Sequence, residues 1–213
     1  MKFINTLVLT AAIGIAHASE LEQLDGKSST KTCRALAMSG GANNGAWENG
    51  VMWGLTHFGK EKDFRWDVVT GVSAGAINAA YMSAWAPRDT KEMTEQLKLA
   101  WESLTTHSIW KLWPDEIATA FLHEGLVDDS PALEFLTYQM SLFKKFKRRF
   151  TLAAADVGTG EYVEFTQKNI KYEEAAQAAL SSGSIPGVFP PQHFKGKTLM
   201  DGGTIWDVNI SSP

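Results

Sequence analysis

Short apolar runs along the chain alternate with longer stretches in which apolar residues recur at helical spacing. The runs at 33–38, 66–70 and 150–157 have the length and composition of buried strands. Helical spacing fills 45–58 and 76–85, the stretches that follow the first two runs. Strands that alternate with helices in this way indicate an α/β domain with a mostly parallel sheet, covered on both faces.

The second half of the chain continues the alternation with further elements. Asp89 followed by Glu92 resembles a capping box that opens an amphipathic helix, and Pro131 suits the first turn of a helix that begins at Ser130. The other predicted elements are a hairpin strand at 162–165, a helix at 173–180, an ordered loop at 184–191 and a short strand at 197–200. No internal repeat or linker interrupts them, so the pattern indicates one domain.

The N-terminus has the pattern of a secretory signal peptide. Lys2 precedes an apolar run at 7–15, and Ala16-His17-Ala18 is an A-x-A cleavage pattern. A membrane anchor is the alternative, but the run is shorter than the roughly 20 residues that a spanning helix needs. We therefore expect cleavage after Ala18 and a secreted or lumenal protein. The expected division is a signal peptide at 1–18 and a domain at 19–213, whose core is about 33–209.

Composition narrows the function classes. The 213 residues include 20 basic and 24 acidic side chains, a net charge of −4, which excludes a nucleic-acid binder driven by bulk charge. With 44% hydrophobic residues, the chain can fill a sizeable core. Cys33 is the single cysteine, so no intrachain disulfide and no cysteine-based metal cluster can form. We expect Cys33 to be buried, no zinc site from histidine spacing, and no metal or cofactor.

The segment Gly71-Val72-Ser73-Ala74-Gly75 fits the pattern G-x-S-x-G between a predicted strand and a predicted helix. In such an elbow the serine lies on a strained turn, and side chains at the flanking glycines would collide with neighbouring backbone. The N-terminus of the following helix favours negative charge, which suits a nucleophile whose attack generates an oxyanion. Ser73 is therefore the candidate nucleophile, and a purely structural turn is the alternative.

The segment 39–45, with the sequence Ser-Gly-Gly-Ala-Asn-Asn-Gly, follows the first predicted strand and opens the first helix. Its successive backbone amides can converge on an anion. A dinucleotide fingerprint needs G-x-G-x-x-G, but Ala42 occupies the middle glycine position, and a serine elbow ends the second strand. An oxyanion hole beside Ser73 is the better interpretation, and a plain structural turn is the alternative.

Asp201-Gly202-Gly203 comes at the end of a predicted short strand, where α/β sheets present functional groups. The two glycines let the backbone pass close to a neighbour. Together with the elbow and the amide-rich loop, this position makes Asp201 the leading candidate for the base that takes the proton from Ser73.

These motifs, in this order, resemble the patatin-like phospholipase family. The resemblance covers about residues 33–209. The segments that carry it are 39–41 with 45–48 and 50–51, then 71–75, then 181–182 with 185–191, and finally 201–203.

The resemblance implies a three-layer α/β/α fold with a mostly parallel central sheet. It also implies a Ser73–Asp201 dyad that hydrolyses acyl esters of glycerolipids or phospholipids at a membrane or lipid interface, without a metal. The oxyanion hole would be formed by the amides of Gly40, Gly41 and Ala42. The glycines expected to support these motifs are Gly45, Gly71, Gly75, Gly202 and Gly203.

Two features depart from the family pattern, whose loop usually reads Gly-Gly-Gly-x-Arg-Gly. Ala42 replaces the third glycine and Asn44 replaces the arginine. Because positive φ costs a non-glycine residue roughly 1–2 kcal/mol, we expect the loop to relax and to displace its donors. The chain also stops at Pro213, where the family usually continues, so we expect a C-terminally shortened sheet or cleft.

Two alternatives to the dyad enzyme stay open at this point. One is an ordinary Ser-His-Asp esterase that uses His193 with Asp128 or Asp156. The other is a lipid-binding homologue that keeps the fold and has lost turnover. Four aromatic residues are candidates for an acyl-binding surface, although core packing is the commoner explanation for such spacing: Trp101, Trp110, Trp113 and Phe121.

Overall fold

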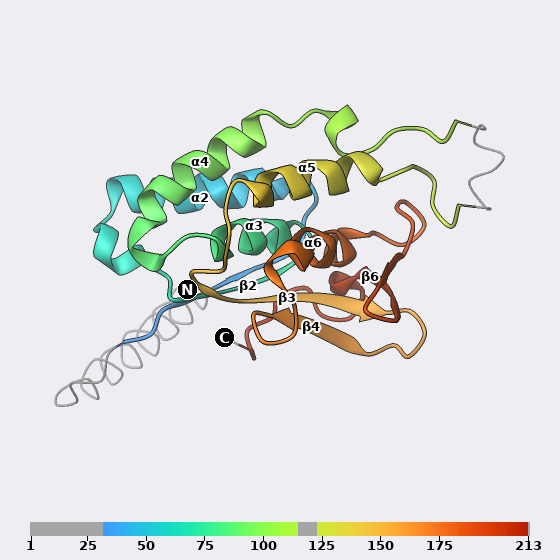
Figure 1. Ribbon diagram of the computed structural model, residues 1–213. Helices are drawn as coiled ribbons and strands as arrows, with labels where there is room; N and C mark the ends of the chain where they lie inside the picture. Colours follow the sequence, from blue (N-terminus) through green and yellow to red (C-terminus); the bar gives the residue numbers. More distant parts are fainter. Residues whose placement is uncertain (1–31, 115–122, 213) are drawn as a thin grey trace, which may run out of the picture. The chain divides into compact units, whose positions relative to one another are not determined.

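A computed structural model describes residues 32–114 and 123–212 (Figure 1). The chain divides into two units, Met1–Thr32 and Cys33–Pro213, and the fold below is that of the second. The signal peptide expected at 1–18 and the aromatic candidate Phe121 lie outside the described residues.

In the described part of the chain, six strands form one mixed sheet. The strands β1, β2 and β3 are parallel, as predicted, while β4 and β6 pair antiparallel with β3, and β5 pairs antiparallel with β6. The short strand β5 was not predicted, because three residues are too few for a period to show. The strands are β1 (Ala35–Met38), β2 (Val68–Val72), β3 (Arg149–Asp156), β4 (Tyr162–Thr166), β5 (Gln192–Phe194) and β6 (Lys197–Asp201).

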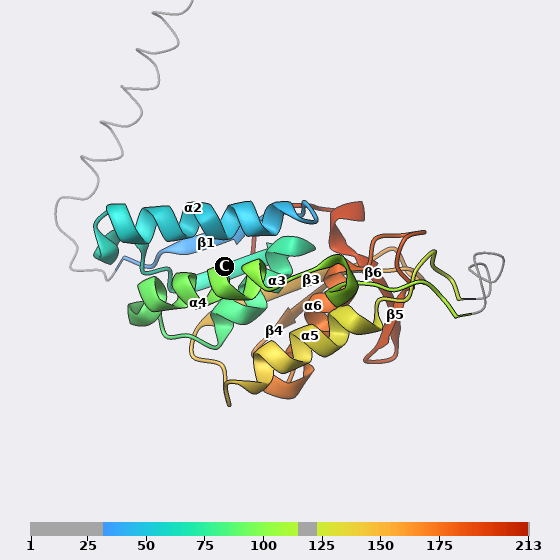
Figure 2. The same cartoon turned by 90° about the horizontal axis from the view of Figure 1, so that it is seen from above.

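The described helices lie on one side of the sheet (Figures 1 and 2). Helices α3 and α6 pack directly on the strands and on each other, whereas α2 and α4 pack on α3, and α5 packs on α6. All residues of α3 except Ile77 are buried, because its small apolar side chains let strands and helices approach it from every side. The helices are α2 (Asn44–Phe58), α3 (Ala74–Ser83), α4 (Thr90–Glu102), α5 (Ser130–Ser141) and α6 (Ala175–Gly183).

The opposite face of the sheet is covered by the C-terminal segment of the described chain. Val69 faces the helices as part of the main core cluster, so alternation turns Thr70 to the other face. There Thr70 Oγ1 donates a hydrogen bond to the carbonyl of Asn209 at 2.5 Å. The fully buried side chain of Asn209 donates to Glu164 on β4 at 2.7 Å. The α/β class is therefore confirmed, with helices on one face and an irregular segment on the other.

Two local predictions were wrong. Asp89 occupies the position before α4 but makes no capping hydrogen bond with its side chain, and its carboxylate lies 3.6 Å from the guanidinium of Arg88 instead. Cys33 is exposed rather than buried.

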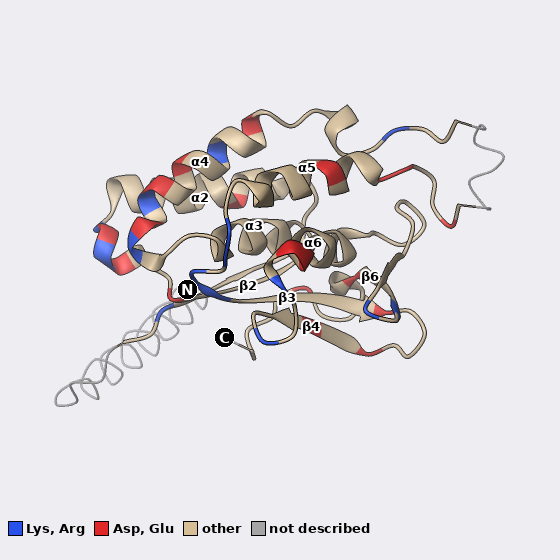
Figure 3. Cartoon of the chain, viewed as in Figure 1, with Lys and Arg blue, Asp and Glu red and all other residues tan. Residues whose placement is uncertain are grey.

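Charged residues recur along α4, while α3 carries none (Figure 3). No helix in the ranges 32–114 and 123–212 is long and apolar enough to cross a membrane.

Candidate active site

Ser73 lies on the strained turn predicted for it, between the end of β2 and the start of α3. Its backbone has φ 53° and ψ −122°, a conformation that a non-glycine residue rarely adopts. A Cβ on Gly71 would lie 2.0 Å from the carbonyl oxygen of Gly75, and a Cβ on Gly75 would lie 2.6 Å from the carbonyl oxygens of Met38 and Ser39. Both glycines are therefore required by the close approach of β1, β2 and α3.

The backbone of Ser73 is held by a residue from α6. Ser182 Oγ accepts a hydrogen bond from the Ser73 N–H at 2.8 Å and donates one to the carbonyl of Ala153 at 2.5 Å. Ser182 is fully buried. The sequence contained this residue in a motif but gave it no role, because nothing local indicates a partner 109 positions away.

Asp201 reaches Ser73 because β2 and β6 meet on the same edge of β3. The last residue of β2, Val72, pairs with Ala153, while Asp201 pairs with the next residue, Ala154. Since β4 occupies the other edge of β3 at 151–155, β2 and β6 must share one edge. They run toward each other there, so their C-terminal ends converge.

The surroundings of Asp201 favour its neutral form more than water does. Burial raises the pKa of Asp201, and the negative charge of nearby Asp207 raises it further. Hydrogen bonds from the Ser73 side chain and from the Gly203 N–H lower this pKa but do not cancel the effect of burial. The Gly203 N–H donates to Asp201 Oδ1 at 2.8 Å. A Cβ on Gly202 would lie 2.4 Å from the carbonyl oxygen of Ala153, so this glycine permits the close approach expected of it.

The loop between β1 and α2 passes beside Ser73, since a Cβ on Gly40 would lie 3.1 Å from Ser73 Cβ. Gly41 has φ 154° and Ala42 has φ 51°, so the alanine takes the left-handed conformation, and the relaxed loop we expected is not formed. Among the described residues, the N–H groups of Gly41 and Ala42 have no acceptor. The Gly40 N–H differs, since it donates to Asp207 Oδ1 at 2.9 Å. Two of the three predicted oxyanion donors are thus open.

A polar network centred on the buried Asn78 supports the end of this loop at Gly45. Asn78 Nδ2 donates to the carbonyl of Gly45 and to Glu48 Oε2, both at 3.0 Å, while Trp101 Nε1 donates to Asn78 Oδ1 at 2.8 Å. Burial raises the pKa of Glu48 to about 7, although hydrogen bonds from Asn78 and Ser39 lower it. Sequence reasoning missed Asn78 and gave Glu48, which lies in the motif segment 45–48, no role, since their spacing is that of ordinary helix residues.

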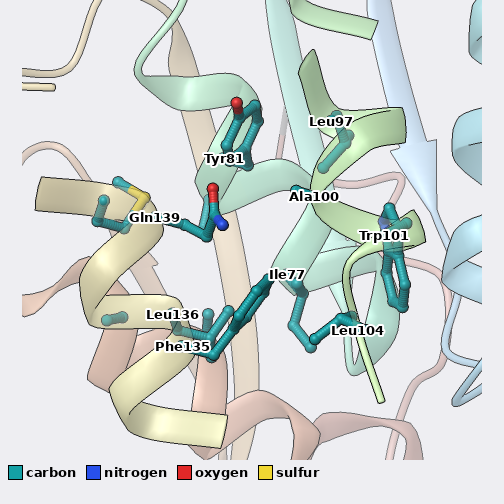
Figure 4. A pocket seen from close by; sticks show the side chains of 13 residues that line it. Ile77, Tyr81, Leu97, Ala100, Trp101, Leu104, Phe135, Leu136 and Gln139 are labelled. Carbon is teal, nitrogen blue, oxygen red and sulfur yellow. The ribbon is translucent and has the colours of Figure 1, made fainter. Parts of the chain in front are cut away.

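Two adjoining apolar cavities lie among α3, α4, α5 and α6, close to the elbow. One of them is drawn in Figure 4, and the other has a volume of about 70 Å³. Both cavities are lined by Ile77, which lies one helical turn after Ser73 and whose N–H donates to the Ser73 carbonyl at 3.2 Å. Trp101 is the aromatic candidate that lines them. The residues shared by both cavities are Ile77, Trp101, Leu104, Phe135 and Leu136.

His193, the base of the alternative triad, is exposed on strand β5, where its Nδ1 lies 3.3 Å from Thr198 Oγ1. The two acids considered for that triad face lysines instead: Asp128 lies 3.2 Å from Lys111, and Asp156 lies 2.7 Å from Lys197. The structure thus brings Asp201, and not His193, to Ser73. Within 32–114 and 123–212, no group of three or more His, Cys, Asp or Glu side chains is arranged to hold a metal ion.

A family model described as patatin-like phospholipase matches residues 36–212. A comparison with curated proteins found no match. Among solved structures, VipD from Legionella pneumophila is similar over 84% of this chain and 47% of its own, with 18% sequence identity and a TM-score of 0.48. The chain therefore spans just under half the length of that protein.

Proposed function

The chain belongs to the patatin-like phospholipase family, and on that premise we propose that it is a lipid acyl hydrolase of the Ser-Asp dyad type. Its substrates are acyl esters of glycerolipids or phospholipids. Ser73 is the nucleophile, Asp201 is the base, and the N–H groups of Gly41 and Ala42 stabilise the oxyanion.

In the proposed mechanism, Ser73 Oγ attacks the ester carbonyl while Asp201 takes the hydroxyl proton. The negative charge that develops on the carbonyl oxygen is stabilised by the Gly41 and Ala42 amides, whose orientation is fixed before the substrate binds. Asp201 then gives the proton to the departing alcohol, which leaves an acyl-enzyme. A water molecule, activated by Asp201, hydrolyses this ester and regenerates Ser73.

The observation that carries the proposal is the contact between Ser73 on its elbow and the buried Asp201. An aspartate in water is a weak base toward serine, with a pKa near 3.9. Burial raises the pKa of Asp201 and thereby strengthens it as a proton acceptor, while the hydrogen bond from Ser73 places the proton on the path of transfer. The apolar cavities beside α3 offer a place for an acyl chain close to the nucleophile.

The test is hydrolysis of p-nitrophenyl esters and of a phospholipid in mixed micelles by the purified protein. Ser73→Ala and Asp201→Asn should each lower kcat by at least about 10³-fold, because a dyad acts as a unit. His193→Ala, an exposed site outside the dyad, is the matched control and should keep its activity. An active Ser73→Ala variant, or an inactive His193→Ala variant, would contradict the assignment.

The pH profile offers an independent test of Asp201. The base must be ionised to accept a proton, so kcat/KM should fall as the pH drops through the raised pKa of Asp201.

A second candidate function, lipid binding without turnover, predicts that labelled lipid binds equally to the wild type and to Ser73→Ala, with no product from either. Because Ala42 holds the left-handed conformation that the open donors need, the enzyme is the better supported of the two.

A further inference from the structure

Asp207 makes a contact with the oxyanion loop that the proposed reaction does not use. Its Oδ1 accepts a hydrogen bond from the Gly40 N–H at 2.9 Å, across 167 positions of sequence. A Cβ on Gly40 would lie 2.5 Å from Asp207 Oδ1 and 3.1 Å from Ser73 Cβ. The carboxylate of Asp207 is therefore hydrogen-bonded to the loop at Gly40, beside the nucleophile and next in sequence to the open donors of Gly41 and Ala42.

The segment that presents Asp207 is fixed on both sides of it. On one side, the Trp206 N–H donates to the carbonyl of Gly202 at 2.9 Å, and Tyr162 Oη donates to the Trp206 carbonyl at 3.2 Å. On the other side, the carbonyl of the buried Asn209 accepts a hydrogen bond from Thr70 on β2, and its side chain donates one to Glu164 on β4. The side chain of Asp207 is exposed, but its backbone is anchored on both sides. Its carboxylate is therefore held in place as a hydrogen-bond acceptor.

The loop needs such an acceptor because its conformation is unfavourable by itself. Ala42 has φ 51°, and a non-glycine residue keeps this conformation only where its surroundings impose it. The loop is tied at Ser39, whose carbonyl accepts from the Gly75 N–H at 3.1 Å, and at Gly45, whose carbonyl accepts from Asn78. Between these ties, the carbonyls of Gly41 and Ala42 accept local hydrogen bonds from the next turn of the chain, at 2.9 and 3.2 Å. The bond from Gly40 to Asp207 is the contact there that comes from a distant part of the sequence.

We propose that Asp207 is a positioning residue for the oxyanion hole: by holding the Gly40 N–H, it aims the N–H groups of Gly41 and Ala42 at the oxyanion. The inference rests on the proposed function of the same site. It assigns Gly40 a place in the scaffold of the loop, and it links the segment after the base Asp201 to the loop that stabilises the transition state.

A carboxylate at this position also places negative charge near the developing oxyanion, which acts against catalysis. The two effects are separable by substitution. Asp207→Asn removes the charge and keeps an oxygen that accepts from the Gly40 N–H. Asp207→Leu has a side chain of similar size with no acceptor, so it removes the charge and the bond together.

The experiment compares kcat and KM for a short-chain p-nitrophenyl ester in these two variants, in Asp207→Ala and in the wild type. If Asp207 positions the donors, kcat of Asp207→Leu and of Asp207→Ala should be at least tenfold below that of Asp207→Asn, with KM within twofold, because the donors act in the transition state. Glu134→Ala, which removes an exposed carboxylate on α5, is the matched control for the loss of a surface charge. Thermal melts identify any variant that does not fold, and the other acceptor-free variant then supplies the comparison.

A second readout separates positioning from a merely structural role. A trifluoromethyl ketone forms a tetrahedral oxyanion with the serine, so its inhibition constant should rise in Asp207→Leu by the same factor as kcat falls, and not in Asp207→Asn. Two results would overturn this inference and leave the proposed function intact. One is a kcat of Asp207→Asn less than tenfold above that of the variants without an acceptor, and the other is an unchanged inhibition constant in Asp207→Leu. Absence of hydrolysis by the wild type would overturn the proposed function and this inference with it.

Discussion

Ser182 Oγ accepts a hydrogen bond from the backbone N–H of Ser73 at 2.8 Å. The same hydroxyl donates to the carbonyl of Ala153, so one buried side chain connects the elbow to β3, the strand that pairs with both β2 and β6. Ser182 thereby fixes the place of the nucleophile relative to Asp201.

We expect Ser182→Ala to lower both stability and activity. Two buried backbone groups lose their partner, which costs about 1–3 kcal/mol, and a displaced nucleophile lowers kcat by roughly 10- to 100-fold. Ser83→Ala is the matched control, because Ser83 is equally buried and its hydroxyl donates only within α3, to the carbonyl of Ala80. Urea denaturation and ester hydrolysis measure the two effects. Equal kcat in both variants would refute this role of Ser182.

The elbow glycines should be intolerant of any side chain. A Cβ on Gly71 would lie 2.0 Å from a backbone oxygen that cannot move without shifting α3, so Gly71→Ala should destabilise the fold by more than about 4 kcal/mol or prevent folding. Gly54→Ala in α2 is the control, since nothing lies within 4 Å of that Cβ. It should stabilise the protein by about 0.5–1 kcal/mol. Thermal melts would contradict the steric argument if the two variants behaved alike.

The raised pKa of Glu48 predicts a pH dependence of stability. Burial raises this pKa from its ordinary value of 4.5 to about 7, so between these values the folded protein binds a proton that the unfolded chain releases. The contribution of Glu48 to the free energy of unfolding is therefore complete below about pH 4.5 and is lost as the pH rises through 7.

Glu48→Gln should remove this loss, because glutamine stays neutral and keeps the hydrogen bond from Asn78. Relative to the wild type, the variant should be more stable at pH 7.5 than at pH 4.5 when both are unfolded in urea. Titrating groups that do not interact with Glu48 contribute equally to the two proteins and cancel in this difference. Glu134→Gln, at an exposed site on α5, serves as the control. A difference that is the same at both pH values would rule out the proposed titration.

The apolar cavities predict a chain-length preference that depends on Phe135. Its ring lines both cavities, so Phe135→Ala should join them and raise kcat/KM for a decanoate ester relative to a butyrate ester. Since Phe135 is half-buried, the loss of stability should be smaller than the about 3–5 kcal/mol of a fully buried phenylalanine. Tyr138→Ala on the exposed side of α5 should leave the ratio unchanged. An unaltered ratio in Phe135→Ala would place the acyl chain elsewhere.

Much of this site could be predicted from the sequence because its signals are local. The elbow needs glycines two residues before and after Ser73, where side chains would meet backbone, and the β-branched pair Val68-Val69 precedes it in the strand. The position of Asp201 at the end of a strand is equally local. Strands that alternate with helices were enough to predict the α/β class and a mostly parallel sheet, in which β1, β2 and β3 run parallel.

The tertiary structure alone decided which of these groups meet. Periodicity shows which face of an element is apolar, but it does not show strand order or register, and register brings Asp201 rather than His193 to Ser73. The contacts of Ser182 with the elbow and of Asp207 with the loop span 109 and 167 positions, so no spacing pattern records them. The one-sided layering has the same origin: α3 has no charged side chain and is covered on nearly all sides, and what covers each side of it is set by packing across the whole chain.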